Sequence, residues 1–175
     1  MLLVHLSDGH HDIQKIIAFE NAFDRIFNII DVEGGVDGGI IVQDCLQLLT
    51  NLLAYNASNQ VLFRETGFIQ KLSRLFNTEG VIQPYALVAR NDSLNMALGV
   101  CRAFVARGGN GTPANQVIMT HIPLLPTSYL SVHSKPSFTM ASYHKFYIWL
   151  FLTKVILVSE QRYHTRSTHS KLYDN

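Results

Sequence analysis

The run Leu48-Leu49-Thr50-Asn51-Leu52 decides the fold of this chain, because an earlier part of the chain has the same pattern. It aligns with Leu2-Leu3-Val4-His5-Leu6 at an offset of 46 residues. The same offset brings Ile16-Ile17 onto Leu62-Phe63, so the apolar positions return in register. Repetition of this kind indicates a stack of similar structural units.

A third and shorter copy follows at a larger offset. Asn59-Gln60-Val61-Leu62-Phe63 aligns with Asn115-Gln116-Val117-Ile118-Met119, and Cys45 aligns with Cys101, both 56 residues later. The additional residues fit a loop insertion around residues 79–90. The chain therefore holds parts of three units, and it begins within one of them.

Apolar residues recur at helical spacing throughout these units. Residues 13–30 are predicted to form one amphipathic helix, with Gln14 on its polar side. The apolar side of this helix would carry Ile16, Phe19, Phe23, Ile26, Phe27 and Ile30. Further helices are predicted over residues 40–55, 60–66, 68–76 and 94–106. Since no segment alternates with period two, no strand is expected.

Local signals set the predicted helix boundaries. Ser58 or Asn59 would cap the helix over residues 60–66, and Gly67 would end it as the residue after the C-cap. Residues 78–90, which contain Gly80 and Pro84, are predicted to be a loop. The helix from Phe68 would present one apolar face, made of Phe68, Ile69, Leu72, Leu75 and Phe76.

A helical repeat with a period near 46 lies in the range of roughly 40–47 residues that is typical of armadillo and HEAT units. We therefore predict an all-α, armadillo-like helical solenoid, a right-handed superhelix of stacked helices. The solenoid would be partial, over residues 1–119, and residues 120–175 would form a divergent, irregular tail. Such arrays need at least about three units to bury their apolar faces, so the chain resembles a piece of something longer.

The tail departs from the repeat pattern after Met119. Prolines at positions 123, 126 and 136 indicate a loop, and residues 146–158 form the most apolar run of the chain. That run is shorter than the roughly 20 apolar residues of a spanning helix, and Lys154 interrupts it. Rather than a membrane span, we expect a helix that packs on the end of the solenoid, or an apolar segment without native packing. Residues 160–175 are polar and are expected to be disordered.

The composition and charge of the chain argue against some classes of function. The chain has 14 basic and 13 acidic residues, a net charge of +1, which gives no electrostatic footprint for nucleic acid. Its two cysteines, Cys45 and Cys101, lie in apolar helical patterns and are expected to be buried, reduced thiols of a cytoplasmic protein. No secretory signal develops after Met1.

No motif supports catalysis or a bound cofactor. The eight histidines lack cysteines or acids at metal-ligand spacing. Gly34-Gly35-Val36-Asp37-Gly38-Gly39 lacks the Lys-Ser/Thr ending of a phosphate-binding loop. No serine or cysteine lies in a nucleophile elbow, and no carboxylate pair is marked for acid–base work. We therefore expect no catalytic residues, no metal and no cofactor, and the chain is predicted not to be an enzyme.

Protein binding remains as the expected activity. In armadillo arrays the last helix of each unit lines a concave groove, where asparagines and charged residues hold partner backbones. The candidates on the faces expected to be least buried are Asn51, Arg64, Gln70, Lys71 and Arg74. Ordinary solvated helix surface explains each of these residues equally well.

Three stretches resemble a particular family. They are Ile13–Arg25 (IQKIIAFENAFDR), Asp37–Leu46 (DGGIIVQDCL) and Asn91–Leu98 (NDSLNMAL). They are similar to the head domain of the general vesicular transport factors, the coiled-coil tethers of the endoplasmic reticulum-to-Golgi pathway, and the resemblance extends over about residues 1–119.

The resemblance implies a role in vesicle tethering in ER-to-Golgi and intra-Golgi transport. Its implied partners are Rab-type GTPases, Golgi matrix proteins and SNAREs, and its implied location is cytoplasmic, peripheral on Golgi membranes. Full-length family members dimerise through a coiled coil, which this sequence lacks together with the acidic C-terminal tail.

Two alternatives stay open. An unrelated armadillo adaptor that binds an extended peptide would show asparagine and tryptophan ladders on successive groove helices, whereas only Asn51 is seen and Trp149 lies outside the repeats. A catalytic helical domain would show a buried carboxylate or histidine in a closed pocket.

Overall fold

The computed structural model describes residues 2–76, 87–106 and 111–121, and this part of the chain consists of helices and short connections, with no strand. Six helices form the first stretch: α1 (Leu2–Ser7), α2 (His11–Phe19), α3 (Ala22–Val32), α4 (Gly39–Leu53), α5 (Ala57–Glu65) and α6 (Phe68–Arg74). A 3₁₀ turn, η1 (Gly35–Asp37), joins α3 to α4, and α7 (Leu87–Val105) and α8 (Thr112–His121) complete the described part.

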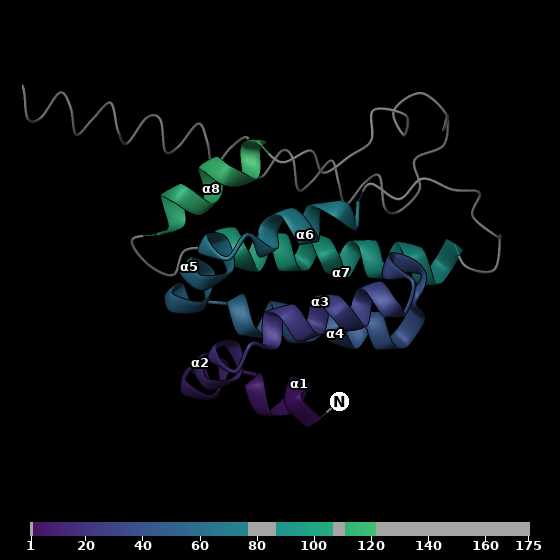
Figure 1. Cartoon of the computed structure of the whole chain (residues 1–175), viewed down its shortest axis with the longest axis horizontal. Coiled ribbons are helices and arrows are strands. Elements are labelled where there is room, and N and C mark those ends of the chain that lie inside the picture. Colours follow the sequence, from purple (N-terminus) through teal and green to yellow (C-terminus); the bar gives the residue numbers. More distant parts are fainter. Residues whose placement is uncertain (1, 77–86, 107–110, 122–175) are drawn as a thin grey trace, which may run out of the picture.

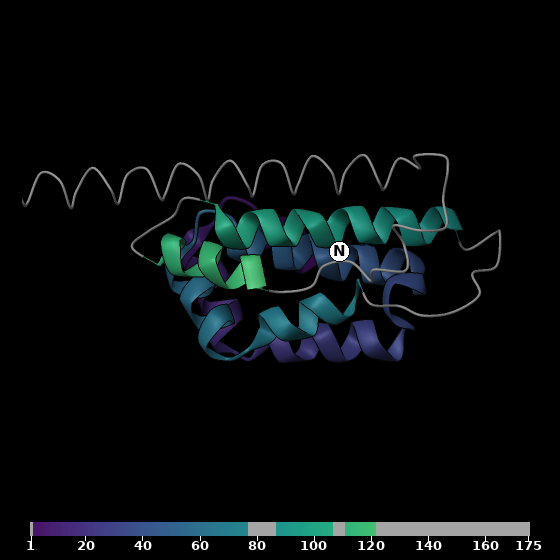
Figure 2. The same ribbon diagram turned by 90° about the horizontal axis from the view of Figure 1, so that it is seen from above.

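The helices stack in the order of the sequence. Figure 1 shows α1 and α2 at one end, α3 and α4 in the middle, and α5 to α8 beyond them. The long helices α4 and α7 lie side by side, as the view from above also shows (Figure 2), and they make the most extensive helix pair. Two units of three helices, α2–α3–α4 and α5–α6–α7, are thus flanked by α1 and α8. The all-α solenoid predicted from the sequence is confirmed.

The helix boundaries reproduce the offset of the sequence repeat. Helix α2 spans residues 11–19 and α5 spans residues 57–65, while α3 and α6 begin at residues 22 and 68. All of these positions differ by 46. The turns agree as well, since Asn21 and Gly67 both adopt left-handed backbone, with φ of 62° and 76°.

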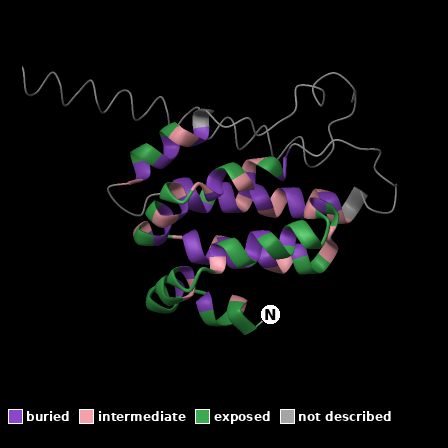
Figure 3. Ribbon diagram, in the orientation of Figure 1, coloured by how far each residue is buried: buried purple, intermediate pink, exposed green. Residues whose placement is uncertain are grey.

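The core is apolar and runs through both units. Figure 3 shows buried residues along α7, whereas α1 and α2 are mostly exposed, and α4 is also largely buried. Phe63 lies at the centre, fully buried, with its ring centroid 5.1 Å from that of Phe23 and 5.6 Å from that of Phe104. Because Phe23, Phe63 and Phe104 come from α3, α5 and α7, this aromatic cluster joins the two units. Edge-to-face and tilted ring pairs of this kind add to the stabilisation from burial.

The predicted single helix over residues 13–30 is wrong, because the structure divides it into α2 and α3. Asn21 breaks it, and asparagine enters the left-handed region more readily than most residues. The break also changes the buried side of α2: Gln14 is buried, whereas Ile16 and Phe19 are 64% and 70% exposed. The predicted core positions on α3 are confirmed as buried.

The other boundaries are partly confirmed. Helix α4 agrees with the prediction, and Gly67 follows the end of α5. The five apolar residues predicted on the helix from Phe68 are all buried, although α6 ends at Arg74, before Leu75 and Phe76. The prediction that Ser58 or Asn59 caps α5 is wrong. Asn56 is the N-cap, and its side-chain oxygen accepts a hydrogen bond from the backbone N–H of Asn59. Helix α7 starts at Leu87, so the predicted loop ends earlier than residue 90, and residues 77–86 lie outside the described residues.

The expectations for the tail, including the apolar run at residues 146–158, lie outside the described residues, which end at residue 121. Within the described part of the chain, no helix is both long and apolar enough to cross a membrane.

Candidate functional site

The five candidate contact residues lie on three different helices. Asn51 is on α4, Arg64 is on α5, and Gln70, Lys71 and Arg74 are on α6. The last helices of the units are α1, α4 and α7, and among the candidates only Asn51 lies on one of them.

Asn51 is buried, so the expectation that it lies on an open face is wrong. Only 8% of it is exposed. Its side-chain amide donates to the carbonyl oxygen of Val4 at 2.9 Å and to Oγ of Ser7 at 3.3 Å, and its oxygen accepts from Nε2 of Gln47 at 2.9 Å. An amide buried without hydrogen-bond partners costs free energy. These bonds therefore explain how the side chain of Asn51, on α4, can be buried against α1.

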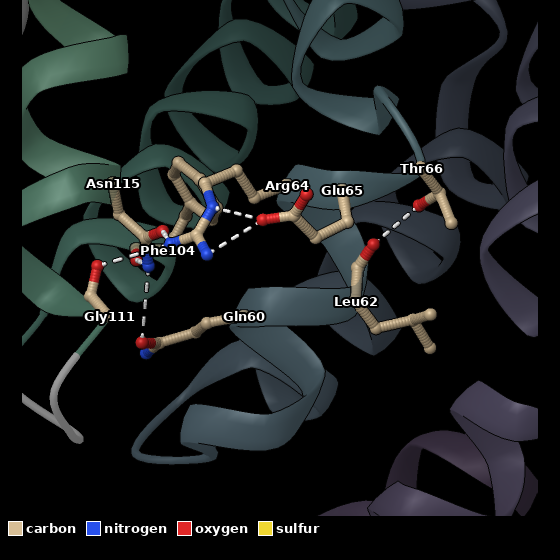
Figure 4. A network of polar contacts seen from close by, with 8 residues as sticks. All are labelled: Gln60, Leu62, Arg64, Glu65, Thr66, Phe104, Gly111 and Asn115. Carbon is tan, nitrogen blue, oxygen red and sulfur yellow. Dashed lines mark hydrogen bonds and ion pairs between the residues drawn. The ribbon is translucent and has the colours of Figure 1, made fainter.

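Arg64 also contacts the neighbouring unit. Its Nη1 donates to Oδ1 of Asn115 at 2.9 Å and to the carbonyl oxygen of Gly111 at 3.4 Å, while Nη2 lies 2.8 Å from Oε1 of Glu65 (Figure 4). The Arg64 side chain is only 16% exposed. The guanidinium therefore joins α5 to the start of α8 and has few donors left for a partner.

The three candidates on α6 are the most accessible ones. Gln70 and Arg74 are exposed and four residues apart, so they share a face of the helix. Nζ of Lys71 lies 2.8 Å from Oδ1 of Asp24 and 5.1 Å from the ring centroid of Phe68. Its side chain remains 42% exposed, and an ion pair this exposed contributes little to stability. Among the five candidates, these three residues therefore keep the side chains most open to solvent.

Sequence reasoning missed a set of buried amides that hold the units together. Nε2 of Gln60 donates to the carbonyl oxygens of Leu53 and Ala103, each at 3.0 Å. Gln14 and Gln116 make corresponding bonds, to the carbonyl oxygens of Ser7 at 2.8 Å and Val105 at 3.2 Å. Each glutamine thus supplies a donor to a carbonyl at or next to the end of the preceding helix, where the backbone leaves acceptors unpaired. The repeat offsets, which relate all three glutamines, were the signal that could have revealed them.

Asparagines extend the same pattern between units. Nδ2 of Asn59 donates to the carbonyl oxygens of Leu52 at 2.9 Å and Gln14 at 3.1 Å. Nδ2 of Asn115 donates to the carbonyl oxygen of Phe104 at 3.1 Å. These bonds are structural, and they fix the register of one unit on the next.

The buried ionisable groups of the described residues do not resemble catalytic machinery. No aspartate, glutamate or histidine is buried there, and no group of three metal-ligating side chains occurs there. Burial raises the pKa of the Cys101 thiol far above its ordinary value. Burial also raises the pKa of Cys45, with smaller contributions from the negative charges of Asp44 and Glu33. A raised pKa disfavours the reactive thiolate form, so both thiols are poor nucleophiles.

The fold and these contacts define the class of protein. It is a segment of an armadillo-like solenoid, in which buried amides and aromatic rings join successive units. No family model matches the sequence.

The sequence is similar to known transport proteins. The sequence is 40% identical over 119 residues to the intracellular protein transport protein USO1 of Saccharomyces cerevisiae, a match that covers 66% of this chain and 6% of that protein. It is 53% identical over 76 residues to the general vesicular transport factor p115 of Homo sapiens, covering 43% of this chain and 8% of that protein. The chain is thus homologous to a segment of the USO1/p115 general vesicular transport factors.

Solved structures agree with this assignment. A crystal structure of Uso1-2 superposes with a TM-score of 0.63 at 36% sequence identity, over 70% of this chain and 18% of that one. The similarity confirms both the family resemblance and the armadillo-like fold predicted from the sequence. The relatives are named as transport proteins, and this chain spans less than a tenth of the length of these two sequence relatives.

Proposed function

We propose that this chain is a protein-binding scaffold, a segment of a vesicle-tethering factor that acts in ER-to-Golgi and intra-Golgi transport. The observation that carries the proposal is the 40% identity over 119 residues to a protein named for intracellular protein transport. The solenoid supports it, because stacked helical units present extended surfaces for binding other proteins.

The proposed partners are Rab-type GTPases, Golgi matrix proteins and SNAREs. The chain would bind them on the cytoplasmic surface of Golgi membranes, as a peripheral protein. In this proposal residues 1–119 supply the binding surface, and residues 120–175 form a separate, divergent tail.

The contact surface that we propose for these partners is the outer face of α6, formed by Gln70, Lys71 and Arg74. Gln70 and Arg74 are exposed, and Lys71 holds only an exposed ion pair with Asp24. Asn51 and Arg64 would act indirectly, because their bonds to α1 and α8 set how neighbouring units are placed.

The test is a pull-down from cytosol with the full, tagged chain, performed with Rab GTPases loaded with GTP or with GDP. We expect a Rab GTPase to be retained in its GTP state, together with Golgi tethers or SNAREs. Arg74→Glu should reduce retention about tenfold, a loss of roughly 1.4 kcal/mol.

The matched control is Arg102→Glu, which makes the same charge change at an exposed position on α7. Its retention should equal that of the wild type. Absence of all Rab GTPases, Golgi tethers and SNAREs from the bound fraction would refute the proposed function. Equal loss for both variants would refute the proposed α6 surface.

A further inference from the structure

The turn between α4 and α5 holds an exposed tyrosine in left-handed backbone. Tyr55 has a φ of 55°, and the equivalent position one unit earlier is Gly9, with a φ of 70°. The repeat thus requires a positive φ at this turn. Glycine meets the requirement without steric cost, whereas a bulky side chain is strained there.

Packing does not explain why tyrosine occupies this position. Tyr55 is 73% exposed, so its ring gains little from burial that could offset the strain. Strained backbone that persists without a structural benefit is a reason to look for a function nearby.

Tyr55 lines an open cleft between the two units, with a volume of about 310 Å³. The other lining residues come from α2 and from the start of α5: His11, Lys15, Asn56, Ala57 and Ser58. The cleft therefore lies on the turns that join successive units, away from the outer face of α6.

The floor of the cleft is fixed by internal hydrogen bonds. Nδ2 of Asn56 donates to Oε1 of Gln14 at 3.0 Å and to the carbonyl oxygen of His11 at 3.3 Å. Its Oδ1 accepts from Oγ of Ser58 at 2.9 Å. The polar atoms of Asn56 therefore already have hydrogen-bond partners within the fold. The side chains of Lys15, His11 and Tyr55 remain to contact a ligand.

These three side chains can donate hydrogen bonds, and Lys15 carries a positive charge. Lys15 pairs with Asp12 at 3.5 Å, its one ion pair among the described residues, and their side chains are 47% and 94% exposed. Exposed pairs of this kind are weak, so a ligand carboxylate can replace Asp12. Tyr55 lines the same cleft as Lys15 and contributes the apolar surface of its ring. A carboxylate attached to a chain with some apolar surface matches both features.

A polyanion such as nucleic acid or an anionic membrane fits less well. Those ligands need an extended basic surface, whereas this cleft has one lysine and the whole chain has a net charge of +1.

We propose that the cleft between Tyr55 and Lys15 binds a carboxylate side chain in an acidic, extended segment of a partner protein. Lys15 pairs with the carboxylate, and the Tyr55 ring packs on the adjoining peptide. The inference names a second surface of the proposed scaffold and rests on that proposed function.

The test uses the full chain and a fluorescein-labelled oligo-glutamate peptide, with an oligo-glutamine peptide as control, followed by fluorescence anisotropy. We expect saturable binding of the glutamate peptide alone, which weakens as salt is added. Lys15→Glu should weaken binding about tenfold, because it removes the pairing cation and places a like charge beside the peptide carboxylates. Tyr55→Gly should weaken it several-fold without lowering the unfolding temperature, because glycine suits this turn.

Arg25→Glu is the matched control, since Arg25 is exposed on α3 and does not line the cleft. It should bind as the wild type does. The inference is overturned by a lack of saturable binding, by equal weakening in Arg25→Glu, or by wild-type affinity in Tyr55→Gly. Peptide binding with no capture of transport proteins would instead overturn the proposed function, so the two failures are distinguishable.

Discussion

Replacing Gln60 by leucine should show how strongly the buried amides couple the units. Gln60 is 1% exposed and donates to the carbonyl oxygens of Leu53 and Ala103, which belong to α4 and α7. Leucine has a similar size but cannot donate, so the carbonyl oxygens of Leu53 and Ala103 would both lose this donor. That of Leu53 would still accept from the backbone N–H of Asn56 at 3.4 Å, so its loss is partial. An unsatisfied buried group costs about 1–3 kcal/mol, and the added apolar surface of leucine offsets part of that cost. We expect the free energy of unfolding to fall by about 1–3 kcal/mol.

The assay is urea unfolding of the full chain, followed by far-ultraviolet circular dichroism. Gln70→Leu is the matched control, because Gln70 is exposed on α6, and its effect should stay within about 0.5 kcal/mol. A loss below about 1 kcal/mol for Gln60→Leu, or a loss equal to that of Gln70→Leu, would refute the reasoning that the amide bonds hold the units together.

Three further predictions use the same measurements. Phe63→Ala should lower the free energy of unfolding by about 3–5 kcal/mol, because it empties the centre of the aromatic cluster; a loss near 1 kcal/mol would contradict that packing. Gly67→Ala should destabilise the chain by about 1 kcal/mol, since φ is 76° at that position. Tyr55→Gly should instead leave the free energy of unfolding unchanged or raise it slightly. The reverse order of the two effects would show that the turns do not require positive φ. Iodoacetamide at mildly alkaline pH should alkylate native Cys101 more slowly than Cys45, because burial raises both pKa values and Cys101 is completely enclosed. Urea should remove the difference, and fast native labelling of Cys101 would contradict its burial.

Much of the fold was predictable because its signals are local or repeated. The helix over residues 40–55 and the break at Gly67 follow from hydrophobic spacing and glycine. The break at Asn21 was missed, although Asn21 lies at the position equivalent to Gly67. The turn residues of the two copies, and not their apolar residues, carry the signal that divides residues 13–30 into two helices.

The candidate site was less predictable. Asn51 and Arg64 are polar, and polarity by itself predicts an exposed position. In the structure they bond to α1 and to the start of α8, parts of the chain 44 to 51 residues away in sequence. Tyr55 carried no signal in the hydrophobic pattern, and only the positive φ and the cleft single it out.

The sequence by itself determined that this protein is a stack of similar helical units, since the spacing of apolar residues and its return after 46 positions are properties of the linear order. The tertiary structure alone decided which polar residues lie inside. A helix end leaves carbonyl oxygens unpaired, and their donors, such as Gln60 and Asn59, can come from a neighbouring unit. That pairing depends on where the units meet in space, and no local pattern records it.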